Sequence, residues 1–93
     1  MIRSFRSSDA AALFEGQRAR RLPADIQTRA HVKLLALNAT PDLRSLAAIP
    51  ANRLEVLRGD RAGQYSLRIN DQWRICFRWV DGHAEGVEIV DYH

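Results

Sequence analysis

The 93-residue sequence contains very little cysteine and lysine, with a single residue of each, Cys76 and Lys33. A lone cysteine cannot form an internal disulfide, which fits a protein of the reducing cytoplasm, and we expect Cys76 to be a buried strand residue. There is no run of about 18 apolar residues, so no membrane span is predicted. The polar opening from Met1 to Arg6 leads into a helix pattern and does not resemble a signal peptide.

The patterns of several large enzyme classes are also missing. The three histidines are scattered and the cysteine has no second cysteine to pair with, so no metal site is expected. Gly59 and Gly63 do not match the glycine-rich loop that binds nucleotide phosphates, and no serine lies in a nucleophile elbow. The sequence therefore predicts neither a metal nor an organic cofactor.

Positive charge is carried almost entirely by arginine. All of the 14 basic residues except Lys33 are arginines, and the net charge is +3. The planar guanidinium suits two-point binding of phosphate, although a GC-rich genome would produce the same bias. Position is therefore more informative than number, because arginines outnumber acids between Asn52 and Trp79. The charged residues of that stretch are Arg53, Arg58, Arg61, Arg68, Arg74 and Arg78, with Glu55, Asp60 and Asp71.

Length and composition predict one small globular domain, residues 1–93, with 46% hydrophobic and 27% charged residues. Helix signals come first in the chain. Ser7 or Ser8 is expected to cap a helix that stops near Gly16. Apolar residues at helical spacing predict a second helix over residues 23–38, with a further helical turn after it.

The rest of the chain alternates like a half-buried sheet. Strands are expected at 54–57, 65–70, 73–79 and 83–90, with a three-residue hairpin turn at 80–82 and a short edge strand at 2–5. Helices followed by a β-meander predict an α+β fold, in which two N-terminal helices pack on one face of a twisted antiparallel sheet.

The alternation also predicts a register for the two central strands. If their large apolar residues share the core face, Leu67 lies opposite Ile75, and Arg68 lies opposite Arg74 on the other face. Like charges at such positions destabilise a sheet. Either Glu88 lies beside Arg74 and neutralises it, or an anion binds between the two arginines.

The sequence closes with three groups that form hydrogen bonds or exchange protons, Asp91, Tyr92 and His93. The preceding Val87–Val90 segment reads as a strand, which would hold them at the rim of the sheet, and imidazole can exchange a proton near neutral pH. The simpler alternative is the polar end of a strand.

Arginines, a carboxylate and a histidine together suit cleavage of RNA without a metal. A base removes the proton of a ribose 2′-OH, and the 2′-oxygen attacks its own phosphate. Arginine stabilises the developing charge, and an acid protonates the departing 5′-oxygen. The ring of Tyr92 can stack on a nucleotide base.

Three segments, Met1–Phe5, Asn52–Phe77 and Val87–His93, resemble the HigB-type toxins of the RelE/ParE superfamily. The resemblance rests on the string L-x-G-D-R-x-G, on S-x-R and N-x-Q-W-R-I after it, and on the closing D-Y-H. It runs nearly from end to end, and it implies the small α+β fold that the residue pattern also predicts.

The resemblance implies a type II toxin that enters the ribosomal A site and cleaves the mRNA there. It also implies a helix-turn-helix antitoxin of the HigA type as partner, with operator DNA contacted only through that antitoxin. No membrane partner is expected, and the expected location is the cytoplasm.

The family motifs assign roles to particular residues. His93 would be the general acid, Arg74 would clamp the scissile phosphate, and Tyr92 would stack or hydrogen-bond at the cleaved nucleotide. Asp91 completes the D-Y-H motif. Further basic side chains would hold the backbone of mRNA or rRNA: Arg58, Arg61 and Arg68.

One residue departs from the pattern, because some members carry a histidine in the strand where this chain has Glu55. The general base is then either Glu55 or Asp91, while Glu55 is alternatively a solvated partner of Arg53 or Arg58. Two other functions stay open: a gyrase-inhibiting toxin of the ParE branch, and a weakly catalytic or inactive module that binds the ribosome, RNA or antitoxin.

Overall fold

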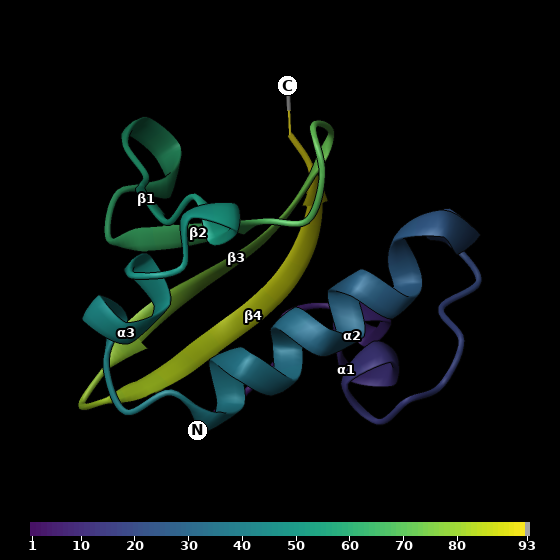
Figure 1. Ribbon diagram of the computed structural model, residues 1–93, viewed down its shortest axis with the longest axis horizontal. Coiled ribbons are helices and arrows are strands. Elements are labelled where there is room, and N and C mark those ends of the chain that lie inside the picture. Colours follow the sequence, from purple (N-terminus) through teal and green to yellow (C-terminus); the bar gives the residue numbers. More distant parts are fainter. Residues whose placement is uncertain (93) are drawn as a thin grey trace.

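The computed structural model describes residues 1–92 (Figure 1). Its helices are α1 (Ser8–Phe14), α2 (Ala24–Ala39) and α3 (Leu43–Ala47), and its strands are β1 (Glu55–Val56), β2 (Gln64–Arg68), β3 (Trp73–Val80) and β4 (His83–Asp91). The 3₁₀ turns η1 (Pro50–Asn52) and η2 (Gly59–Arg61) flank β1. No helix in this described range is long and apolar enough to cross a membrane.

Side-chain caps explain where two of the helices begin. The Ser7 hydroxyl accepts a hydrogen bond from the Ala10 N–H at 3.2 Å, and the Asp42 carboxylate accepts one from the Ser45 N–H at 2.8 Å. The bonds from Ser45 stabilise the ionised form and lower the pKa of Asp42. Of the two caps predicted for α1, Ser7 is the one used.

The four strands form one antiparallel sheet in the order β1-β2-β3-β4. The start of the chain runs beside β4, where Ile2 and Phe5 form isolated parallel bridges to Ala84 and Val87. The predicted edge strand at 2–5 is thus reduced to two isolated bridges.

The core lies between the helices and one face of the sheet, and Figure 1 shows α2 running alongside β4. Apolar residues at helical spacing on α2 meet the inward residues of β2, β3 and β4. The buried set includes Ile26, Ala30, Leu34, Leu37, Leu67, Ile75, Phe77 and Val87. The α+β prediction is therefore confirmed, and the other face of the sheet is left for polar side chains.

The register of β2 and β3 is the predicted one. Leu67 faces Ile75, and Arg68 faces Arg74. Since side chains alternate along a strand, the two arginines and the nearby Ser66 share the face opposite to that of Leu67 and Ile75. This surface is called the open face below.

The predicted position of Glu88 beside Arg74 is wrong, for two reasons. The first is the hairpin turn, which was expected to contain three residues. Val80 pairs with His83, so the turn is the dipeptide Asp81-Gly82, with φ angles of 50° and 77°. Two successive left-handed residues form the tight turn that suits the twist of a hairpin.

The second reason is a bulge in β4. Gly86 and Val87 together lie opposite the single residue Phe77, and Gly86 has a φ of 61°, which glycine adopts without strain. The shorter turn and the extra residue shift the register by two positions. Glu88 therefore faces Cys76 instead of Arg74.

Candidate active site

Arg74 lies on β3, at the centre of the open face, and is 6% exposed. Its Nε donates a hydrogen bond to Ser66 Oγ at 2.7 Å, and its NH2 group donates to the carbonyl oxygens of Arg53 at 2.5 Å and Ser66 at 3.4 Å. NH1 lies 3.3 Å from Oε1 of Glu55. The neutral acceptors fix the plane of the guanidinium and leave NH1 as the nitrogen that can meet a ligand.

Glu55 reaches Arg74 from β1, where it pairs with Ser66 across the sheet. Its side chain is 48% exposed, while that of Arg74 is 7% exposed. The carboxylate is thus open to solvent on one side and held by a buried cation on the other. Of the partners weighed for Glu55 in the sequence, neither Arg53 nor Arg58 is the one found, since the ion pair forms with Arg74.

Tyr92 covers the same guanidinium, with the Cζ atom of Arg74 5.4 Å from the centre of the phenol ring. Two hydrogen bonds with Gln72 fix this end of the chain. The Tyr92 N–H donates to the carbonyl oxygen of Gln72 at 2.6 Å, and Nε2 of Gln72 donates to the Asp91 carboxylate at 3.0 Å. His93, the expected general acid, lies outside the described residues.

Each of the two facing arginines has its own carboxylate. Arg68 forms an ion pair with Asp71 three residues later, and Arg74 pairs with Glu55. The like charges are therefore balanced locally, without the predicted help of Glu88. Because Asp71 is almost fully exposed, its pairing with Arg68 is easily exchanged for another anion.

The remaining predicted RNA-binding residues lie at η2. Arg61 donates to Glu88 and to Gln64 Oε1, both at 3.1 Å, so its guanidinium is already engaged within the protein. Arg58 is exposed at the start of η2. The two arginines that the sequence groups together thus differ in their surroundings: Arg61 is bound to side chains of the protein, and Arg58 is exposed to solvent.

Sequence reasoning missed three groups that shape the site. They are Ser66, the backbone carbonyl of Arg53 and the side chain of Gln72. Ser66 alternates in phase with Arg68, so the strand pattern already placed it on the open face. The Arg53 carbonyl was not predictable, because it depends on a left-handed backbone with φ of 40° just after η1.

Cys76 is buried on β3, as expected for a strand residue. Burial raises the pKa of its thiol, with a further contribution from Glu88, while Arg61 and Arg74 act in the opposite direction. A thiol kept neutral in this way is a poor nucleophile. Within residues 1–92, no group of three His, Cys, Asp or Glu side chains lies close enough to hold a metal ion.

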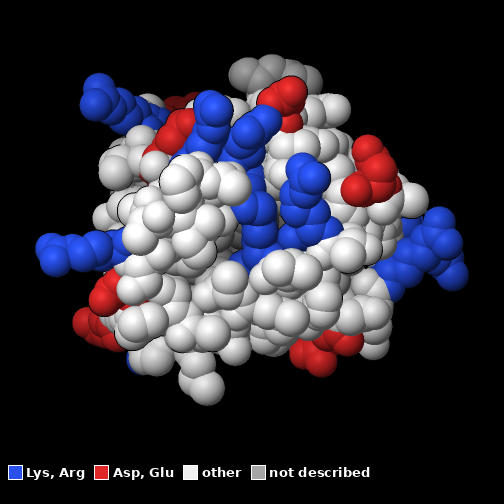
Figure 2. Space-filling view, viewed as in Figure 1, with Lys and Arg blue, Asp and Glu red and all other residues white. Residues whose placement is uncertain are grey.

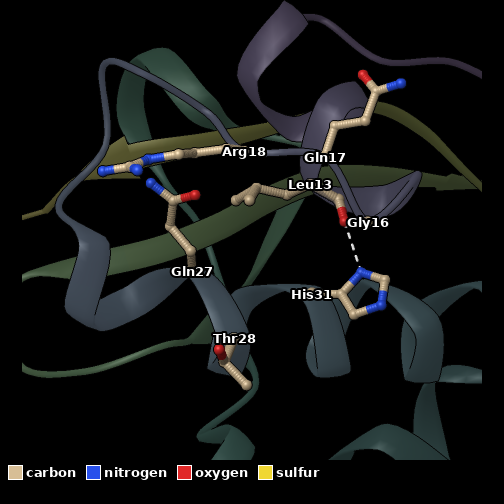
Figure 3. A pocket seen from close by; sticks show the side chains of 7 residues that line it. All are labelled: Leu13, Gly16, Gln17, Arg18, Gln27, Thr28 and His31. Atoms are coloured by element: carbon tan, nitrogen blue, oxygen red, sulfur yellow. Dashed lines mark hydrogen bonds between the residues drawn. The ribbon is translucent and has the colours of Figure 1, made fainter.

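A separate pocket of about 330 Å³ lies between α1, α2 and the loop that joins them (Figure 3). His31 Nδ1 lies 2.5 Å from the carbonyl oxygen of Leu13, and Gln27 bonds to the backbone of Ala19 in the loop. These contacts fasten the loop to α2. The lining residues come from positions 13–31, whereas the groups around Arg74 come from positions 53–92.

The comparison with protein families gives a match over almost the whole chain. Residues 3–93 match the model of the RelE-like toxin of the type II toxin–antitoxin system HigB. The chain belongs to this family. The expectation of a HigB-type toxin, drawn from the sequence motifs, is confirmed.

Two proteins that bear the name HigB are similar to this chain. Toxin HigB-1 of Vibrio cholerae serotype O1 is 39% identical over 70 residues, which cover 75% of this chain and 74% of that toxin. Endoribonuclease HigB of Proteus vulgaris is 31% identical over 93 residues, which cover all of both chains.

Solved structures of other proteins share the fold of this HigB-like chain. The YoeB–YefM complex from Staphylococcus aureus gives a TM-score of 0.61 at 18% identity and covers 100% of this chain and 98% of that one. YafQ from E. coli strain BL21(DE3) gives 0.56 at 12% identity, covering 98% and 93%. These likenesses support the RelE-like α+β architecture.

Proposed function

We propose that this HigB-like toxin is a ribosome-dependent endoribonuclease that cleaves mRNA in the ribosomal A site by attack of a ribose 2′-OH, and so inhibits translation. The Proteus vulgaris relative, aligned along the whole chain, bears the name endoribonuclease HigB. The observation that carries the proposal is the grouping of Glu55, Arg74 and Tyr92 on the open face.

The base in this mechanism is Glu55. Its carboxylate is half exposed and lies on the NH1 side of Arg74, where a phosphate oxygen would approach. A carboxylate beside the phosphate clamp is within reach of the 2′-OH of the same nucleotide, whereas Asp91 is held by Gln72. Glu55 thus takes the proton, and the 2′-oxygen attacks phosphorus.

Arg74 stabilises the charge that gathers on the phosphate oxygens. Its guanidinium is fixed by Ser66 and by the Arg53 carbonyl, so little reorganisation is needed when the charge develops. NH1 turns from the Glu55 carboxylate to the phosphate as the carboxylate receives its proton. The phenol of Tyr92, over the same guanidinium, presents its ring to the cleaved nucleotide.

The last step is protonation of the departing 5′-oxygen, which the proposal assigns to His93. The bond from phosphorus to the 5′-oxygen breaks, and the products are a 2′,3′-cyclic phosphate and a free 5′-OH. Each proton transfer is thus given to a side chain, and the mechanism calls for no metal ion.

The ribosome is proposed to align the substrate with these groups. Arg58 and Arg68 are proposed to hold backbone phosphates of mRNA or rRNA, as is Arg61 in exchange for its bonds to Gln64 and Glu88, which helps to bring the attacking oxygen into line with its leaving group. We also propose that a helix-turn-helix antitoxin of the HigA type neutralises the toxin. In support, a neighbour by fold is the YoeB–YefM toxin–antitoxin complex.

The test is to map mRNA 5′ ends in a translating extract with the toxin and its variants. Glu55→Gln should lower the cleavage rate by about 10²- to 10⁴-fold, as expected for loss of a general base. Removal of His93 should abolish the cuts, and ribosome-free mRNA should stay intact. Glu85→Gln is the matched control, because Glu85 also lies on a strand and forms an exposed ion pair, with Arg3 at 3.5 Å. This variant should cleave mRNA at the wild-type rate.

The variants also separate the alternatives. A large loss of cleavage rate in Asp91→Asn with no loss in Glu55→Gln would identify Asp91 as the general base. Growth arrest with DNA damage, without RNA cuts and without dependence on His93, would indicate a gyrase inhibitor of the ParE kind and overturn the proposal. Harmless expression in the absence of antitoxin would indicate an inactive binding module.

A further inference from the structure

Basic side chains gather near the centre of the face shown in Figure 2, between the segment holding α3 and η1 on one side and α2 on the other. Three cations that lie near one another, defined here as the α2 cluster, are Lys33 and Arg29 from α2 and Arg68 from the end of β2. Sequence motifs single out only Arg68. The two residues on α2 have no role in the cleavage chemistry proposed above.

Contacts with neutral oxygens hold the two α2 side chains in place. Lys33 Nζ donates to the side-chain carbonyl of Asn52 at 2.7 Å, and Arg29 NH1 donates to the backbone carbonyl of Ile69 at 3.1 Å. Asn52 is itself buried and donates to the carbonyl of Leu46 at 3.0 Å. The cations are therefore positioned by the fold without being neutralised by these contacts.

The cluster is short of negative charge. Burial lowers the pKa of Lys33, and the nearby Arg29 and Arg68 guanidinium groups lower it further. Among the described residues, the carboxylate recorded on the cluster is Asp71 on Arg68, with a side chain that is 96% exposed. An anion bound among the three cations would relieve their repulsion more fully than this solvated partner does.

The α2 cluster adjoins the proposed active site through the short segment after η1. Asn52, which holds Lys33, is followed directly by Arg53, and the Arg53 carbonyl accepts a hydrogen bond from Arg74. Arg68 provides a second link, because it faces Arg74 across β2 and β3. A ligand lying over Arg74 would thus have its neighbouring portion within reach of the cluster.

We propose that Lys33, Arg29 and Arg68 form a second phosphate-binding site, which takes a backbone phosphate of RNA next to the phosphate held at Arg74. The proposal rests on the RNA-directed function argued above, and it adds α2 to the RNA-binding surface. The phosphate belongs either to the mRNA strand or to rRNA, since both carry the same phosphodiester. Ammonium and guanidinium groups on neighbouring side chains suit an oxyanion of this kind.

The first experiment measures how RNA binding depends on salt. Fluorescence anisotropy with a single-stranded 2′-O-methyl RNA, which cannot be cleaved by 2′-OH attack, gives the slope of log K against log[KCl]. Each lost phosphate contact should reduce that slope by about 0.7. Lys33→Gln removes the charge but keeps an N–H donor for Asn52, and should produce this reduction.

Arg20→Gln is the matched control, because it removes one charge from the exposed loop before α2 and should leave the slope unchanged. Thermal unfolding confirms that both variants fold. A second arm measures binding to ribosomes with and without mRNA. A loss for Lys33→Gln that requires mRNA assigns the phosphate to mRNA, and an equal loss on empty ribosomes assigns it to rRNA.

The proposal is overturned if Lys33→Gln matches the wild type on RNA and on both kinds of ribosome. Weakened binding only to an acidic antitoxin segment would likewise overturn it and make the cluster a protein-docking site. If the slope changes as expected but the wild type cuts no mRNA, the phosphate site stands and the nuclease proposal fails. If the wild type cuts mRNA but Lys33→Gln changes neither the slope nor binding to either kind of ribosome, the nuclease proposal stands and the phosphate site fails.

Discussion

At the scale of a single residue, Arg74 both holds neighbouring segments together and provides the proposed phosphate-binding group. Three of its contacts tie β3 to β2 and to the segment after η1, and the fourth reaches the Glu55 carboxylate. A guanidinium can make these bonds at once because its donors form a rigid planar fork. Replacing this arginine therefore changes the fold as well as the site.

Arg74→Lys keeps the charge but cannot satisfy Ser66 and the Arg53 carbonyl together. Since Ser66 is fully buried, we expect a loss of about 1–3 kcal/mol in the free energy of unfolding, measured in urea. Arg78→Lys, at an exposed position of the same strand, should change it little. Equal stability of the two variants would contradict the anchoring role of Arg74.

At the scale of the elements, the sequence patterns predicted more than the presence of helices and strands. Strict alternation in β2 and β3 was enough to set Arg68 opposite Arg74, because a shift of one residue would have turned Leu67 and Ile75 out of the core. The position of Glu88 was wrong because the turn has two residues instead of three and because Gly86 adds a bulge to β4. The contact between the Arg53 carbonyl and Arg74 could not be predicted either, because it depends on the left-handed backbone conformation of Arg53.

Helix α1 offers a test of local capping. Ser7→Ala removes the bond to the Ala10 N–H and should lower the free energy of unfolding by about 1 kcal/mol, measured by thermal or urea unfolding. Ser8→Ala changes the next residue, an exposed position inside the helix, and should be neutral or slightly stabilising. The reverse order would show that Ser8 is the cap.

At the scale of the whole molecule, stability depends on one small core beneath α2. The apolar positions of that core were visible in the sequence as a helical repeat and a strand alternation, so the fold class was predictable. The site was less predictable, since Glu55, Ser66 and Arg74 come from different strands, Tyr92 follows β4, and the four meet only after folding.

Adjacent leucines on α2 separate core from surface. Leu34 is 0% exposed and Leu35 is 44% exposed. Leu34→Ala should cost about 2–5 kcal/mol in unfolding free energy, while Leu35→Ala should cost well under half of that. Denaturant curves of the two variants provide the measurement, and similar midpoints would contradict the placement of the core. A domain of this size has little stability to lose, so Leu34→Ala should also abolish toxicity.

The composition of the chain gives the α2 cluster one further property. Lys33 carries the only side-chain amine in the sequence, and burial and the nearby guanidinium groups lower its pKa. Reagents that acylate amines therefore have one side-chain target besides the α-amine of Met1, and that target lies in the proposed phosphate site itself. An acetyl group on Lys33 would erase its charge without any change of sequence, so this amine would serve both as a reporter of RNA occupancy and as a chemical off-switch.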